Sequence, residues 1–123
     1  MSTTLVPATT YPAVLGKTIV EIRKDKTISQ GDLAGAVNVT ASTWSKIERG
    51  VSALTIEQLV LAAKALDKTP GYIVKAADDA AAQLRLQGIE VREGRIGDSN
   101  TGLVLIGVAA IGLVLATILA SKK

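Results

Sequence analysis

The first two thirds of the chain show apolar and polar positions with the period of amphipathic helices. Between residues 13 and 26, apolar side chains recur at Val14, Leu15, Ile19 and Ile22, and the other faces carry the charged residues Lys17, Glu21, Arg23 and Lys24. Apolar residues three and four positions apart lie on one face of an α-helix. This spacing therefore predicts a first helix over residues 13–26.

Four further helices are predicted from residues that typically begin them. A side-chain oxygen at the N-cap accepts a hydrogen bond from a backbone N–H group of the first turn, and Pro suits the first helical position. The third helix is expected to end at Arg49-Gly50. Gly31 and Gly35 weaken the second helix by about 0.5–1 kcal/mol each relative to Ala. The predicted caps are Ser29, Thr40, the Thr55–Gln58 capping box, and Thr69 followed by Pro70.

These patterns divide the chain into five segments. The first is rich in Thr with two Pro, the third holds four Gly, and the fourth has no charged residue. The segments are a flexible N-terminal arm (1–12), a helical domain with an extended fifth helix (13–87), a linker (88–102), an apolar helix (103–120) and a short basic tail (121–123).

The apolar segment predicts a transmembrane helix. Its 18 residues would form a helix of about 27 Å, close to the roughly 30 Å hydrocarbon thickness of a bilayer. It is apolar on all faces, and a domain of five short helices offers little core in which to bury it. Gly112, Ala116 and Ala120 fall four residues apart, a stripe of small residues that would allow close packing between membrane helices.

Charge and composition narrow the chemistry. The chain has 14 basic and 11 acidic residues, a net charge of +3, and this excess lies within residues 13–75. A basic domain suits a polyanionic partner. The absence of Cys and His excludes thiol chemistry, ordinary zinc sites and imidazole acid–base catalysis. No motif for a nucleophile or a phosphate-binding loop is found, so we expect neither an enzyme nor a cofactor.

Two stretches carry an ordered set of motifs: LGKTIVEIRKDKTISQGDLAGAVNVTASTWSKIERG and TIEQLVLAAKALDKTPGYI. They contain an Arg in the first helix, Ser-Gln opening the second, Leu-Ala within it, Ile-Glu-Arg-Gly ending the third and Ala-Leu ending the fourth. In this order and spacing, residues 14–75 resemble the lambda-type repressor and Cro (XRE-like) family of helix-turn-helix domains. The resemblance implies an all-α, five-helix fold, to which this chain would add its transmembrane helix.

In that family the start of the third helix enters the major groove of DNA. The resemblance implies that Lys46 can donate to guanine, that Ser42 can pair with several bases, and that the Ala41 methyl group suits thymine. Gln30 would touch phosphate or a base at the edge of the site, and Lys17 is a weaker phosphate candidate. The full set of expected DNA-binding residues is Gln30, Thr40, Ala41, Ser42, Thr43, Ser45, Lys46 and Lys17.

Two residues match a structural pair of the family. Arg23 and Glu48 correspond to residues that form an internal salt bridge there, which implies the same pairing in this chain. The spacing of Val39, Trp44 and Ile47 directs Trp44 into the core and away from bound bases. The outward face of the third helix is poor in Arg, Asn and Gln, the side chains that make the best bidentate base contacts.

Together these features predict a membrane-anchored DNA-binding protein, prokaryotic or phage-encoded, that regulates transcription or tethers DNA. It would be a single-pass protein of the inner (cytoplasmic) membrane, with its N-terminal domain in the cytoplasm and the lipid bilayer and duplex DNA as partners. Family members usually dimerise on two half-sites, and we expect a homodimer or higher homo-oligomer. The alternative is a membrane-anchored adaptor or virion membrane protein that uses the fold for protein contacts.

Overall fold

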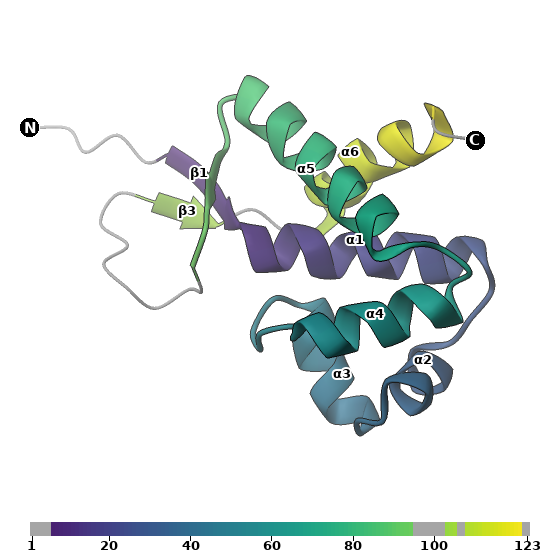
Figure 1. The fold of residues 1–123 in the computed structure, drawn as a ribbon. Helices are drawn as coiled ribbons and strands as arrows, with labels where there is room; N and C mark the ends of the chain where they lie inside the picture. The colour runs from purple at the N-terminus through teal and green to yellow at the C-terminus, as the bar shows by residue number, and fades with distance from the viewer. Residues whose placement is uncertain (1–5, 95–102, 106–107, 122–123) are drawn as a thin grey trace, which may run out of the picture.

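The computed structural model describes residues 6–94, 103–105 and 108–121 (Figure 1). Helix α1 crosses the middle of the molecule, with α2, α3 and α4 on one side and α5 and α6 on the other. The elements in chain order are β1 (Val6–Thr10), α1 (Tyr11–Asp25), α2 (Gln30–Val37), α3 (Ala41–Glu48), α4 (Ile56–Ala65), α5 (Pro70–Leu86), β2 (Glu90–Arg92), β3 (Leu103–Leu105) and α6 (Val108–Ser121).

The predicted caps begin the helices. Ser29, Thr40, Thr55 and Thr69 each accept a hydrogen bond from the backbone N–H three residues ahead, and the capping box at Thr55 is complete. Helix α1 begins earlier than residue 13, because the Thr10 side chain caps it from the end of β1. These side chains satisfy N–H groups that have no partner within their own helix.

A first core joins α1 to α2, α3 and α4. Trp44 of α3 is fully buried, as are Ile19 of α1, Leu33 of α2 and Leu66 after α4. Trp44 is thus a core residue, as the spacing predicts.

A second core lies on the other side of α1 and includes α6. Ile111 and Leu115 of α6 are buried against Val14 of α1 and an alanine-rich face of α5. Because alanine side chains are short, this face lets another helix approach closely. The α5 alanines in this core are Ala77, Ala80 and Ala81.

The transmembrane prediction is wrong. The segment 103–120 does not form one long helix: Leu103–Leu105 form β3, and α6 has 14 residues, about 21 Å at 1.5 Å per residue. Among the described residues, no helix combines the length and apolarity needed to cross a bilayer. The alanine-rich face of α5 supplies the burial that the prediction overlooked. The inner-membrane location and the lipid-bilayer partner, which rested on that helix, are corrected with it.

Of the small-residue stripe, Gly112 lies close to α1, while Ala116 and Ala120 are exposed. A Cβ atom on Gly112 would lie 3.2 Å from Cε of Lys17 on α1. Ala116 and Ala120 line a hollow of about 370 Å³ together with residues of α1 and α5. The stripe therefore faces α1 of its own chain.

The fold also contains a small parallel sheet, so it is not all-α. Strand β1 lies at the centre and pairs with β2 and with β3, with Ala8 opposite both Glu90 and Leu105. Ala8, Thr9 and Thr10 are buried. The sheet thus orders residues 6–10, part of the segment expected to be a flexible arm, and residues 90–92 of the expected linker.

Candidate nucleic-acid interface

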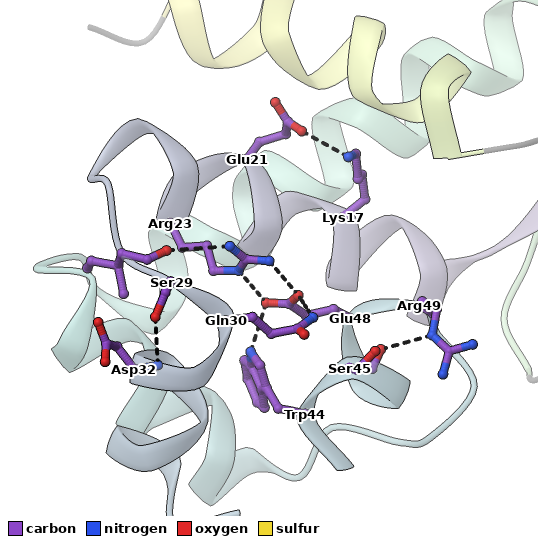
Figure 2. Close-up of polar contacts among 11 residues, drawn as sticks. Lys17, Glu21, Arg23, Ser29, Gln30, Asp32, Trp44, Ser45, Glu48 and Arg49 are labelled. Carbon is purple, nitrogen blue, oxygen red and sulfur yellow. Dashed lines mark hydrogen bonds and ion pairs between the residues drawn. The ribbon is translucent and has the colours of Figure 1, made fainter. Parts of the chain in front are cut away.

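A buried carboxylate ties together the helices that build the interface. Arg23 of α1 donates from Nε and Nη2 to the two oxygens of Glu48 at 2.7 and 3.0 Å. Gln30 Nε2 and Trp44 Nε1 donate to the same carboxylate at 2.7 and 2.8 Å (Figure 2). The side chains of Arg23 and Glu48 are only 12% and 3% exposed. The pair implied by the family resemblance is thus present, and each Glu48 oxygen accepts two hydrogen bonds.

This network fixes α3 relative to α1 and α2. Glu48 lies at the end of α3, Arg23 near the end of α1, and Gln30 at the first position of α2. A bidentate arginine–carboxylate pair restrains orientation as well as distance. The angle between α2 and α3 is therefore set partly by buried hydrogen bonds.

The turn between α2 and α3 is equally defined. Asn38 ends α2 with φ of 65°, in the left-handed region that Asn tolerates better than most residues. The Val39 N–H donates to Ala34 O at 3.1 Å, which closes the turn. Helix α3 begins two residues later.

The outward side of α3 is open. The residues on it expected to bind DNA come from its cap and its first turns, and the described residues leave that surface uncovered. Thr40, Ala41, Ser42, Thr43 and Lys46 are exposed, and Ser45 is partly exposed.

Backbone donors add to this surface. Thr40 Oγ1 accepts from the Thr43 N–H at 3.1 Å, and Ser29 Oγ accepts from the Asp32 N–H at 3.0 Å. The earlier N–H groups of each helix have no partner in that helix. An N-terminus of this kind favours phosphate through both its N–H groups and the helix dipole.

Arg49 extends the outward face of α3 and was missed by the sequence reasoning. It is exposed, and its Nε donates to Ser45 O at 3.3 Å, which holds the guanidinium beside the helix (Figure 2). In the sequence analysis, Arg49 was considered only as part of the Arg49-Gly50 pair that ends the third helix. Its position three residues after Lys46 was the available signal, since residues three apart share a face.

Lys17 does not belong to this surface. Its Nζ lies 3.1 Å from Oε2 of Glu21, and its side chain is mostly buried. Figure 2 shows the pair on the side of α1 that faces α6, away from Trp44. Lys17 thus lies apart from the other expected DNA-binding residues, between α1 and α6, beside Glu21 and Gly112.

The interface has few cations. Lys46 and Arg49 are exposed on α3, while Asp32 in the first turn of α2 is exposed and acidic. Glu48, the other charged residue of α3, is neutralised inside the domain by Arg23 of α1. The surface is thus only mildly basic. This agrees with the small number of Arg side chains on the outward face of α3.

Two short helices joined by a tight turn, with the second open to solvent along its first turns, define a helix-turn-helix domain. Residues 19–73 match the helix-turn-helix family model. They therefore form a helix-turn-helix domain of the XRE-like kind, as the resemblance implies.

Relatives with this domain extend the comparison. The chain is 32% and 30% identical, over 66 residues, to uncharacterized HTH-type transcriptional regulators of Rickettsia conorii and Rickettsia prowazekii. These alignments cover 54% of this chain and 53% and 51% of the two relatives, so the chain spans about half of their length.

Solved structures share the fold. A crystal structure of the clp gene regulator ClgR from Corynebacterium glutamicum is similar with a TM-score of 0.61 and 26% identity, over 63% of this chain and 82% of ClgR. A point mutant of the restriction-modification controller protein C.Esp1396I is similar with a TM-score of 0.51 and 29% identity, over 55% of this chain and 86% of that one.

Proposed function

We propose that this protein binds duplex DNA through the outward face of α3 and the start of α2, and regulates transcription from that site. The observation that carries the proposal is the exposed surface of Ala41, Ser42, Lys46 and Arg49 on a helix held rigidly by the Glu48 network. It is supported by similarity to HTH-type transcriptional regulators. The protein would act by binding, without catalysis.

Each group has a distinct role in the proposed complex. Lys46 donates to guanine O6 or N7, Ser42 pairs with base edges, and the Ala41 methyl group contacts thymine. The free N–H groups at the starts of α2 and α3 hold phosphates, which positions the protein without reading sequence. Arg49 adds a phosphate contact at the far end of α3.

Gln30 acts through the structure as well as through DNA. One amide hydrogen is used by Glu48 at 2.7 Å, while the carbonyl oxygen and the second hydrogen remain to face the nucleic acid. Gln30 thus aligns α2 with α3 where both meet the backbone. Its loss should weaken binding to all sequences by similar amounts.

Fluorescence anisotropy of the full chain with labelled duplexes tests the proposal. Lys46→Ala should cost about 1–3 kcal/mol on the preferred site and relax sequence preference, whereas Gln30→Ala should lower affinity evenly. The matched control is Lys75→Ala, which removes the same charge from α5. With few cations on the face, log affinity should fall against log salt with a slope of about −2 per copy.

The result that contradicts the proposal is equally definite. If the chain shows no salt-sensitive binding to duplex DNA, even when dimerised artificially, then α3 does not bind DNA. The fold would then act as an adaptor that uses this face for protein contacts. An equal effect of Lys46→Ala and Lys75→Ala would place binding elsewhere on the molecule.

A further inference from the structure

The hollow of about 370 Å³ lies between the end of α1, the start of α5 and the end of α6. In Figure 1, α5 and α6 lie across α1 from α3. Binding sites for small molecules occupy roughly 300–1,000 Å³, so the hollow has the size of a site for a small ligand.

Part of the lining is aliphatic. Ala116, Leu119 and Ala120 of α6 line the hollow together with Ile22 of α1. Leu119 packs against the first core, while Ala116 and Ala120 are exposed. Because the two alanine side chains are short, they leave room beside Leu119 for the apolar body of a ligand.

The polar part of the lining contains two lysines that lack an acidic partner. Lys26 and Lys68 are partly buried, and neither forms an ion pair with any residue that the structure describes. Nζ of Lys68 lies 4.4 Å from the centre of the Tyr72 ring, which also lines the hollow. This contact with the ring face attracts the ammonium group and restrains it at the hollow without neutralising it.

The acidic side chains of the lining are already engaged. Oε2 of Glu21 lies 3.1 Å from Nζ of Lys17, and Asp25 is not without a partner either. The hollow therefore has two ammonium groups available to a ligand beside an aliphatic surface. A carboxylate accepts hydrogen bonds from ammonium groups, and such charged bonds are stronger than neutral ones.

We propose that this hollow binds a small aliphatic monocarboxylate. The carboxylate accepts hydrogen bonds from Lys26 and Lys68, and the hydrocarbon body lies against Leu119, between Ala116 and Ala120. An anion of this kind gives both lysines a partner and removes apolar surface from water at the same time.

This site is separate from the proposed DNA interface. Figure 2 shows Lys17 and Glu21 directed toward α6, whereas Arg23 points away from them to Glu48. The hollow lies on the Glu21 side of α1. Binding of a carboxylate here does not depend on whether α3 binds DNA.

Isothermal titration calorimetry of the full chain with octanoate tests the proposal. For a ligand of this size we expect a dissociation constant of roughly 0.1–1 mM. Hexanoate, which is two CH₂ groups shorter, should bind about tenfold more weakly. Octan-1-ol and octylammonium carry the same chain without the negative charge, and each should also bind at least about tenfold more weakly than octanoate.

Substitutions locate the carboxylate. Lys26→Met and Lys68→Met keep most of the side-chain length and should each weaken octanoate binding about tenfold. The matched control is Lys64→Met, which removes an exposed lysine of α4 that does not line the hollow, and it should leave the affinity unchanged. Equal affinities of all three variants would overturn the proposal.

A filling substitution locates the hydrocarbon body. Ala116→Phe should fill the hollow and weaken octanoate binding at least about thirtyfold, whereas Thr117→Phe adds a ring at the next exposed position of α6, outside the lining, and should not. Thermal unfolding verifies the fold of each variant. No binding of octanoate at about 10 mM overturns the proposal, as does equal affinity for octan-1-ol or octylammonium. Unchanged binding by a folded Ala116→Phe variant also overturns it.

Discussion

At the scale of single residues, Glu48 links stability to the proposed function. Its carboxylate is buried and accepts four hydrogen bonds, from Arg23, Gln30 and Trp44. Burying a charge is costly unless it is paired and fully hydrogen-bonded, and Glu48 meets both conditions. The same residue holds the end of the helix whose start is proposed to meet DNA.

Glu48→Ala should therefore destabilise the domain by about 3–5 kcal/mol, because it leaves the Arg23 guanidinium buried without its partner. Chemical denaturation measures this change. Lys75→Ala, which removes an exposed ion pair with Asp79, should cost about 0.3–0.5 kcal/mol. Similar losses for the two variants would mean that Glu48 contributes no more than a surface charge.

Tyr11 should make stability fall at alkaline pH. Its burial raises the pKa of its hydroxyl well above the usual value, and the hydrogen bond to Asp78 at 2.6 Å and the charge of that carboxylate act in the same direction. The folded state therefore keeps its proton when the unfolded chain loses it, above about pH 10. Stability is fully present below that pH and declines above it.

The unfolding free energy of the wild type should consequently fall more steeply above about pH 10 than that of Tyr11→Phe, which has no proton to lose. Denaturant midpoints at several pH values measure the difference. Tyr72 and the lysines are present in both proteins, so their contributions cancel in the comparison. Parallel curves for the two proteins would contradict the linkage.

Sequence reasoning reached several of these residues and not others. Caps such as Thr40 were predictable because a cap acts on its own helix within three residues. The Arg23–Glu48 pair was implied by resemblance. The bond from Gln30 to Glu48 was not foreseen, because it depends on how α2 and α3 cross. The position of Lys17 between α1 and α6 was not foreseen, since its neighbours on α6 are nearly a hundred positions away.

At the scale of elements, the approach of α1 to α3 is set by a missing side chain. A Cβ atom on Gly16 would lie 2.4 Å from the backbone oxygen of Glu48 and 2.7 Å from that of Ile47. Both neighbours are backbone atoms that cannot rotate away. Glycine at this position therefore lets α3 lie directly against α1.

Gly16→Ala should cost about 1–3 kcal/mol or more, because the helices must separate. Gly35→Ala is the matched substitution: nothing lies within 4 Å of its added methyl group, and it should stabilise α2 by about 0.5–1 kcal/mol. Opposite shifts in thermal midpoint are expected. Shifts of the same sign would show that the two helices are not in close contact.

Helix α6 illustrates why its environment could not be read from its own residues. Its composition is uniformly apolar, which is typical of a membrane span. The deciding feature lies on α5, where alanines at positions 77, 80 and 81 form a surface that buries Ile111 and Leu115. These alanines are visible in the sequence, but there they indicate only that the segment forms a helix readily.

Because α6 packs against α1 and α5 on one face only, replacing its leucines by alanine should affect stability unequally. Leu115→Ala should cost about 2–5 kcal/mol, because this side chain is fully buried between α1 and α5. Leu113→Ala should change stability by less than about 0.5 kcal/mol, because Leu113 is 74% exposed. Denaturation of both variants checks this, and equal effects would mean that α6 does not pack as described.

At the scale of the whole molecule, two cores share α1 and separate two surfaces. The first core supports α2, α3 and α4, and the outward residues of α2 and α3 carry the proposed DNA contacts. The second, with the sheet and α6, lies across α1 from that surface (Figure 1). The helix-turn-helix half was predictable because its signals are local and its motifs ordered. The sheet was not, because its strands pair residues about 80 to 100 positions apart.

The central claim is that duplex DNA is bound by the start of α2 and the outward face of α3. Titration of the ¹⁵N-labelled chain with duplex DNA, followed by NMR, tests it most directly. The account predicts shifts at the amides of Gln30, Ser42, Lys46 and Arg49, reversed by added salt. It also predicts that the amide of Leu115 stays unchanged. Shifts gathered on α5 and α6 instead, or none at any DNA concentration, would contradict it.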